Sequence, residues 1–212
     1  MTRGRFIAFE GGEGAGKSTQ SRLLAEALRA RGIAVLLTRE PGGTPGAEAI
    51  RGLLLDPPGE GWGAQAEALL FAAARADHVA RAIRPALEAG TWVISDRFVD
   101  SSRAYQGGGG GLSDADVLEL HGVGSGGLLP DLTLLIEIPP EEAAARLARR
   151  DGGESDAIGG RDAAYHADVA AAFARIAEAE PARFARIRSD DGAQDTHALV
   201  LQAIAALLEE PR

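Results

Sequence analysis

The clearest chemical signature in this chain is a glycine-rich loop near the N-terminus. Residues 11–18 read GGEGAGKS and match the pattern G-x-x-x-x-G-K-[ST] at every fixed position. Glycines let backbone N–H groups converge on phosphate oxygens, and the N-terminus of a following helix adds partial positive charge. We therefore expect the loop to bind ATP through Gly11, Gly12, Glu13, Gly14, Ala15, Gly16, Lys17, Ser18 and Thr19.

Lys17 is the only lysine among the 212 residues, so any step that needs an ammonium group must use it. In this motif the lysine contacts the β and γ phosphates, and the hydroxyl of the next residue, here Ser18, ligates Mg²⁺. The lack of a second lysine also excludes the Asn-Lys-x-Asp motif with which GTPases usually read guanine. The usual GTPase interpretation is thereby removed.

A second charged pair, Asp96 and Arg97, directly follows the apolar run 91–95. Ligands of open α/β sheets bind at the carboxyl ends of the strands, where this pair would lie. Asp96 could hold Mg²⁺ directly or through water, and Arg97 could neutralise charge between donor and acceptor phosphates. The sequence thus predicts Ser18 and Asp96 as metal ligands, and Lys17 and Arg97 as catalytic residues.

The elements that must position these residues are short apolar runs alternating with longer helical patterns. That alternation predicts an α/β fold, in which a parallel sheet is covered by helices on both faces. We expect a five-stranded P-loop three-layer sandwich with a short lid, as a single domain over residues 1–212. The predicted strands are 5–10, 33–38, 91–95, 132–138 and 184–188, and the predicted helices are 17–31, 47–55, 66–89, 114–123, 141–150, 162–178 and 196–209.

Composition excludes several other classes of protein. A net charge of -9 argues against sequence-independent binding of nucleic acid. The absence of cysteine excludes disulfides and thiolate metal sites. No apolar run approaches the ~18 residues of a membrane span, and the N-terminal run is too short for a signal peptide. We therefore expect a cytoplasmic protein with neither nucleic-acid nor membrane partners.

Six segments together carry a resemblance to a known family. They read EGGEGAGKST (10–19), TREPGGT (38–44), IRGLLLD (50–56), LLFAAARADH (69–78), DRFVDSSRAYQG (96–107) and LLPDLTLLIEI (128–138). In this combination the sequence resembles the bacterial thymidylate kinases, which are P-loop nucleoside monophosphate kinases. The resemblance implies transfer of the γ-phosphoryl group of ATP to dTMP, giving dTDP for dTTP biosynthesis, by a homodimer.

The resemblance also implies an acceptor site. Phe71 and Arg75 are four residues apart and would share a helix face. The matching aromatic residue of the family stacks on thymine, and the matching arginine hydrogen-bonds a base carbonyl. The apolar neighbours of Phe71 leave a purely structural role open. By resemblance, Ser102 and Gln106 lie at the base, Tyr105 lies where a ribose 2′-hydroxyl would be, and Glu13 contacts the sugar 3′-hydroxyl. Arg39 and Arg51 match family positions near the acceptor phosphate. Arg97, placed between the two phosphates by its charge, completes the predicted dTMP-binding residues.

The predicted lid, about residues 149–161, departs from the family pattern. Bacterial members whose P-loop has no basic residue beside its acid commonly carry an Asp-Arg pair in the lid, followed by glutamate. The matching stretch here is DAIG (156–159), so both the arginine and the glutamate are missing. An arginine can be worth about 10³–10⁵ in the rate of phosphoryl transfer, and we expect Arg149 or Arg150 to act as the catalytic lid arginine.

Two glycine-rich stretches, 107–111 and 151–160, predict mobile loops. In the first, Gly110 replaces an arginine that is common in relatives. Two alternatives stay open at this point. One is a kinase for another nucleoside monophosphate, such as dUMP or CMP, which the space around Phe71 for the thymine methyl would separate. The other is a nucleotide-binding protein without catalysis, which the missing lid arginine suggests.

Overall fold

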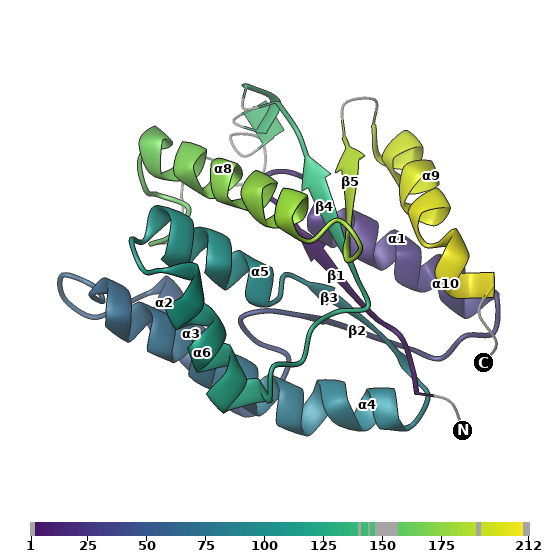
Figure 1. Cartoon of the computed structure of the whole chain (residues 1–212), viewed down its shortest axis with the longest axis horizontal. Helices are drawn as coiled ribbons and strands as arrows, with labels where there is room; N and C mark the ends of the chain where they lie inside the picture. Colours follow the sequence, from purple (N-terminus) through teal and green to yellow (C-terminus); the bar gives the residue numbers. More distant parts are fainter. Residues whose placement is uncertain (1–2, 140, 144, 147–156, 190–191, 210–212) are drawn as a thin grey trace.

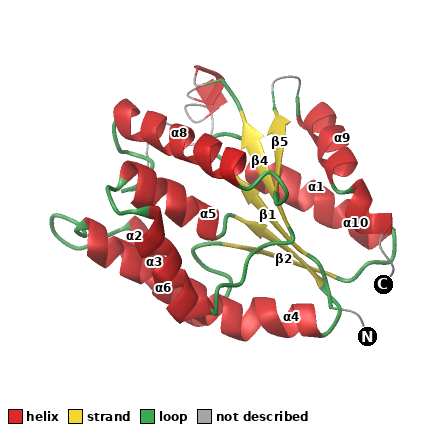
Figure 2. Ribbon diagram, in the orientation of Figure 1, coloured by secondary structure: helices red, strands yellow, loops and turns green. Residues whose placement is uncertain are grey.

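In the computed structural model, residues 3–139, 141–143, 145–146, 157–189 and 192–209 are described. Five parallel strands form one sheet in the order β2-β3-β1-β4-β5 (Figures 1 and 2), which confirms the predicted fold class. Along the chain the strands are β1 (Phe6–Glu10), β2 (Val35–Arg39), β3 (Trp92–Asp96), β4 (Leu132–Glu137) and β5 (Phe184–Arg188). The sheet register places Asp96 beside both Phe9 and Arg39, so the carboxyl ends of β1, β2 and β3 meet.

Helices cover both faces of the sheet (Figure 1). On one face, Leu24 and Leu28 of α1 and Val200 of α9 pack against the strands. On the other face, Val79 and Phe98 belong to the cluster around Phe6 and Val93. The helical elements are α1 (Lys17–Ala30), α2 (Pro45–Leu55), α3 (Ala64–His78), η1 (Val79–Ile83), α4 (Arg84–Glu88), α5 (Val99–Ser102), η2 (Arg103–Gly109), α6 (Asp114–Ser125), α8 (Ala163–Ala179), α9 (Ala193–Ala203) and α10 (Ala205–Glu209).

Two predicted helices are divided in the structure. The range 66–89 corresponds to α3, the π-helical segment η1 and α4. Pro85, in the first turn of α4, has no N–H with which to continue the α-helical ladder, which accounts for the altered hydrogen bonding before it. The range 196–209 corresponds to α9 and α10, which meet at Ile204. Of the predicted helix 141–150, residues 141–143 and 145–146 are helical, and the rest lie outside the described residues.

The prediction of a loop at 107–111 is wrong for residues 107–109. Residues up to Gly109 belong to the π-helical segment η2, which packs against α8. A Cβ on Gly108 would lie 2.4 Å from the Cβ of Ala172, so the close approach of the two elements requires glycine there. The second stretch, 151–160, falls outside the described residues as far as residue 156.

The helix starts follow local capping chemistry. Ser113 and Asp116 form a capping box at α6, as their spacing predicts. Thr44 caps α2 by accepting a hydrogen bond from the N–H of Ala47 at 3.2 Å. No described helix is both long and apolar enough to cross a membrane.

Candidate active site

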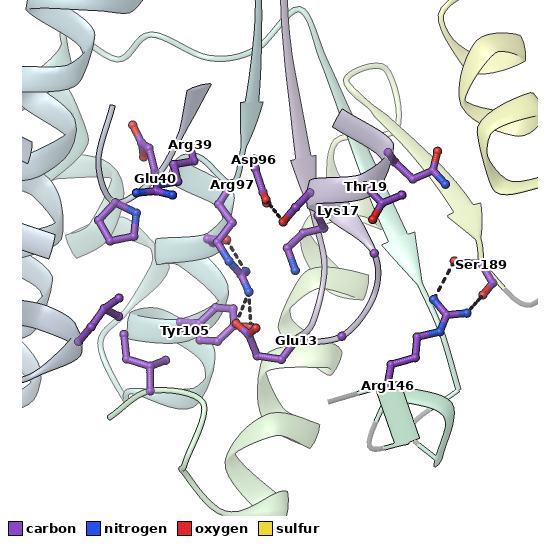
Figure 3. A pocket seen from close by; sticks show the side chains of 18 of the residues that line it. Glu13, Lys17, Thr19, Arg39, Glu40, Asp96, Arg97, Tyr105, Arg146 and Ser189 are labelled. Atoms are coloured by element: carbon purple, nitrogen blue, oxygen red, sulfur yellow. Dashed lines mark hydrogen bonds and ion pairs between the residues drawn. The ribbon is translucent and has the colours of Figure 1, made fainter. Parts of the chain in front are cut away.

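A cavity of about 860 Å³ lies at the carboxyl ends of the central strands. The loop after β1, the start of α1 and the end of β3 line one part of it, and α2, α3 and η2 line another. Figure 3 shows Lys17, Asp96 and Arg97 projecting into this space, with Arg146 on the far side of the loop. One continuous cavity therefore joins the predicted phosphate loop to the predicted acceptor residues.

The backbone of the phosphate loop depends on its glycines. Gly11, Gly14 and Gly16 have positive φ, a conformation that residues with a Cβ rarely adopt. A Cβ on Gly11 would also lie 2.3 Å from the carbonyl oxygen of Ile136 on β4. Helix α1 begins at Lys17, and the residues of its first turn, Lys17, Ser18 and Thr19, line the cavity. This is the geometry that binds phosphate at a helix N-terminus.

Lys17 is buried under the loop, where its Nζ donates a hydrogen bond to the carbonyl oxygen of Gly12 at 2.6 Å. Burial, and then repulsion from Arg97, lower the pKa of Lys17 to about 8, and attraction from Glu13 and Asp96 offsets only part of that effect. A bound phosphate would supply the missing negative charge. The ammonium group is therefore poised to gain from an anionic ligand.

The two residues predicted as metal ligands are in contact, since the Ser18 hydroxyl donates a hydrogen bond to Oδ2 of Asp96. A hydroxyl and a carboxylate are oxygen ligands of the kind that Mg²⁺ prefers, with phosphates and water completing its coordination. The residues present thus fit a magnesium ion carried in with a nucleotide.

Arg97 lies between the loop and the acceptor residues. Its Nη2 donates to Oε1 of Glu13 and, at 3.2 Å, to the Tyr105 hydroxyl, and its Nη1 donates to the Gly11 carbonyl at 3.1 Å. The guanidinium also lies 5.0 Å from the centre of the Tyr105 ring. Among the described residues, Arg97 is the only non-glycine residue with positive φ, at 69°. Such backbone outliers concentrate at functional sites.

Five of the predicted dTMP-binding residues surround the acceptor end of the cavity: Arg39, Arg51, Phe71, Tyr105 and Gln106. Arg39 forms an ion pair with Glu48 at 3.2 Å, and Nη1 of Arg51 donates to the carbonyl of Pro41 at 2.7 Å. Phe71 is half-buried and packs beside the cluster that contains Tyr105. Its side chain therefore serves both the core and the cavity wall.

Arg75 and Ser102 do not line the cavity and are instead buried against each other. Nη2 of Arg75 donates to the Ser102 hydroxyl at 2.8 Å, and its Nε donates to Glu40 at 2.7 Å. Burial alone would raise the pKa of Glu40, but Arg75 and His78 outweigh it and hold that pKa below its usual value. Glu40 also lines the cavity; it stands in the segment 38–44 that carries the resemblance, but no role was predicted for it.

The two predicted catalytic lid arginines, Arg149 and Arg150, lie outside the described residues. Arg146, which was not predicted, lines the cavity next to Gly16 and donates to the carbonyl oxygen of Ser189 at 2.8 Å. The sequence could have indicated Arg146, because Arg146, Arg149 and Arg150 have the i, i+3, i+4 spacing of one helix face. Beyond them, Ile158 lines the cavity, one residue after the alanine that replaces the family's arginine.

A parallel sheet, a phosphate loop that opens a helix, and an arginine-rich acceptor end in the same cavity define a P-loop kinase. The thymidylate kinase family model matches residues 9–200 of this chain. The chain therefore belongs to the thymidylate kinase family.

Individual relatives agree with this assignment. A thymidylate kinase of Rhizorhabdus wittichii is 58% identical over 205 residues, which cover 97% of this chain and 99% of the relative. A thymidylate kinase of Chromohalobacter salexigens is 49% identical over 211 residues, which cover 99% of this chain and 97% of the relative. The crystal structure of thymidylate kinase from Ehrlichia chaffeensis matches with a TM-score of 0.77 at 33% identity, covering 95% of this chain and 99% of the other.

Proposed function

We propose that this protein transfers the γ-phosphoryl group of ATP to the 5′-phosphate of dTMP, giving ADP and dTDP. The observation that carries the proposal is the single cavity lined by Lys17 and Ser18 at one end and by Phe71 and Gln106 at the other, with Arg97 between. A donor phosphate chain and an acceptor nucleotide can both lie in it. Family membership supports the choice of dTMP over other monophosphates.

The reaction needs no covalent enzyme intermediate. An oxygen of the acceptor phosphate attacks the γ-phosphorus in line, the bond to the bridging β–γ oxygen breaks, and ADP leaves with that electron pair. The protein positions the two nucleotides and neutralises charge on the transferring group with Lys17 and Arg97. Ser18 and Asp96 would hold the Mg²⁺ ion, which supplies further neutralisation of phosphate charge.

Several finer assignments stay predictions. Arg149 or Arg150 would supply the lid charge. The base would be recognised by Phe71, Arg75, Ser102 and Gln106. Glu13 and Tyr105 would contact the sugar, and Arg39 and Arg51 the acceptor phosphate. We also infer that the protein is a homodimer, because the family resemblance implies dimerisation and the packed helices α3 and α6 carry the exposed side chains of Leu69 and Val123. Each chain would form one domain, and the dimer would act in the cytoplasm.

The test is ADP release by purified protein with ATP and Mg²⁺, with dTMP, dUMP, dCMP, dGMP, AMP, CMP and UMP offered separately. We expect turnover with dTMP to exceed that with each of the others. Turnover with a different acceptor would retract the base-recognition roles of Phe71 and Arg75. Binding of ATP without turnover on any acceptor would instead support a binding protein and point to the Ala157 position as the cause.

A further inference from the structure

The side-chain amide of Gln106 is held from behind by a carboxylate. Gln106 lines the cavity but is only 2% exposed, and its Nε2 donates a hydrogen bond to Oε1 of Glu67 on α3 at 2.9 Å. The other carboxylate oxygen of Glu67 accepts a hydrogen bond from Nη2 of Arg161. Both oxygens of Glu67 are therefore engaged, one by an amide and one by a guanidinium.

A carboxylate can only accept hydrogen bonds, so it fixes which end of the amide faces it. The reversed amide would place its oxygen against Oε1 of Glu67 and leave a buried acceptor opposed to a negative charge. With Nε2 facing Glu67, no described residue donates a hydrogen bond to the amide oxygen of Gln106. That oxygen is consequently the polar atom that the amide can offer to a ligand.

We propose that Glu67 is a positioning residue for substrate specificity: it makes Gln106 present an oxygen, and so a hydrogen-bond acceptor, to the acceptor base. Thymine and uracil carry an N–H donor at N3, which this oxygen can accept. Cytosine carries a lone pair at N3, which the oxygen would repel. This inference rests on the proposed function, because it assumes that a pyrimidine base lies beside Gln106.

Arg161 stabilises the arrangement without determining it. Its Nη1 donates to the Tyr165 hydroxyl at 2.6 Å, and that hydroxyl donates to the backbone carbonyl of Tyr105 at 3.0 Å. The guanidinium also lies 4.6 Å from the centre of the Tyr165 ring. Removing Arg161 would break the ion pair yet leave the carboxylate in place. The orientation of the Gln106 amide should then persist.

This difference provides a matched pair of variants. Glu67→Gln is isosteric and can donate to the Gln106 oxygen, which frees the amide to turn. Arg161→Leu breaks the same ion pair but keeps the acceptor-only carboxylate. The dissociation constants of dTMP and dCMP are measured by calorimetry for each protein, so that turnover does not enter. We expect Glu67→Gln to lower the preference for dTMP over dCMP about tenfold, and Arg161→Leu to change it by less than about twofold.

An unchanged preference in Glu67→Gln would overturn the inference, as would an equal loss in Arg161→Leu, which would point to the ion pair itself. Binding of ATP with unaltered affinity shows that each variant is folded. If Glu67→Gln does not fold, Gln106→Met is measured instead. Retention of the full preference without the amide would equally overturn the inference. Wild-type protein that shows no preference for dTMP would contradict the proposed function itself, and this inference with it.

Discussion

At the scale of single residues, the depressed pKa of Lys17 predicts a coupling between ATP binding and protonation. In the free protein that pKa is lowered to about 8, chiefly by burial. Phosphate charge would raise the pKa in the complex, so binding near pH 8 should take up about half a proton per site. Affinity should accordingly fall as the pH rises through 8. Calorimetry in two buffers of different ionisation enthalpy measures the uptake directly.

Lys17→Arg is the control for this prediction, because a guanidinium stays charged throughout the accessible range of pH. Its affinity for ATP should vary little between pH 7 and pH 9. An equally steep decline in the wild type and the variant would show that another group, and not Lys17, carries the pH dependence.

The residues that the sequence identified are those whose chemistry is local. Lys17 and Ser18 stand in a contiguous motif whose spacing specifies a phosphate loop, and in the structure Ser18 hydrogen-bonds to Asp96. The sequence predicted no role for Glu67, nor for Glu40 although Glu40 lies in the quoted segment 38–44, because the partners of both lie far along the chain. Glu40 meets Arg75 across 35 residues, and Glu67 meets Arg161 across 94. Nothing in either neighbourhood marks such a pairing.

At the scale of elements, the contact between η2 and α8 predicts a steric effect at Gly108. Alanine there would place a Cβ 2.4 Å from that of Ala172, which we expect to lower the free energy of unfolding by about 1–3 kcal/mol. The second change Ala172→Gly should restore part of the loss. Chemical denaturation of the single and double variants measures both effects.

Gly52→Ala offers a matched control for the glycine substitution itself. Gly52 lies inside α2, and nothing lies within 4 Å of a Cβ built there. Alanine should therefore be neutral, or stabilise the protein by up to about 1 kcal/mol. A comparable loss of stability at both positions would show that the effect at Gly108 is not steric.

The contact between η2 and α8 also explains why the loop predicted at 107–111 is helical as far as Gly109. A run of five glycines predicts a loop, since glycine is a poor helix former. Tertiary packing reverses that preference, because α8 lies so close that a larger side chain has no room at Gly108. By contrast, the helices α1 and α6 follow their predicted ranges closely, since their starts carry strong local signals at Gly16 and Ser113.

At the scale of the whole molecule, a buried cluster around Asp100 joins elements distant in sequence. Asp100 is fully buried and accepts hydrogen bonds from Arg103 at 3.0 Å, Arg183 at 2.6 Å and Thr133 at 3.2 Å. Asp100→Asn removes the negative charge and leaves two guanidinium groups only partly paired. We expect a loss of about 3 kcal/mol in the free energy of unfolding, measured by urea denaturation.

Glu26→Gln is the comparison for this variant, since Glu26 forms an exposed i, i+4 ion pair with Arg22. Exposed pairs of this kind are worth less than about 0.5 kcal/mol. If the two substitutions cost the same, the Asp100 cluster contributes no more than a surface pair.

The inferred homodimer predicts an effect of the exposed apolar residues on assembly. Val123 of α6 is 87% exposed. If it lies in the interface, Val123→Glu should reduce the mass in solution from twice the chain mass of 21.9 kDa to that of one chain. Leu199→Glu, at an exposed position on α9, should leave the mass unchanged. Light scattering after size exclusion measures both, and a dimeric Val123→Glu protein would contradict an interface at α6.

The overall architecture was predictable to the level of five parallel strands covered by helices, but not to the order of the strands. Alternating apolar runs and helices indicate a parallel sheet, since each crossover needs a helix. Which strands become neighbours depends on long-range pairing. β1 lies between β3 and β4, although about 80 residues separate it from its nearer partner in sequence. Periodicity within one segment holds no information about such a pairing.

The single lysine of the phosphate loop makes the protein its own spectroscopic probe. Because Lys17 is the only lysine, growth on lysine labelled with ¹⁵N at the side chain would give one side-chain resonance, with no assignment needed. That signal would come from the Lys17 amine, which is hydrogen-bonded to the Gly12 carbonyl. Its chemical shift would follow protonation and phosphate binding at the loop, without the mutation or dye that most enzymes require for such a measurement.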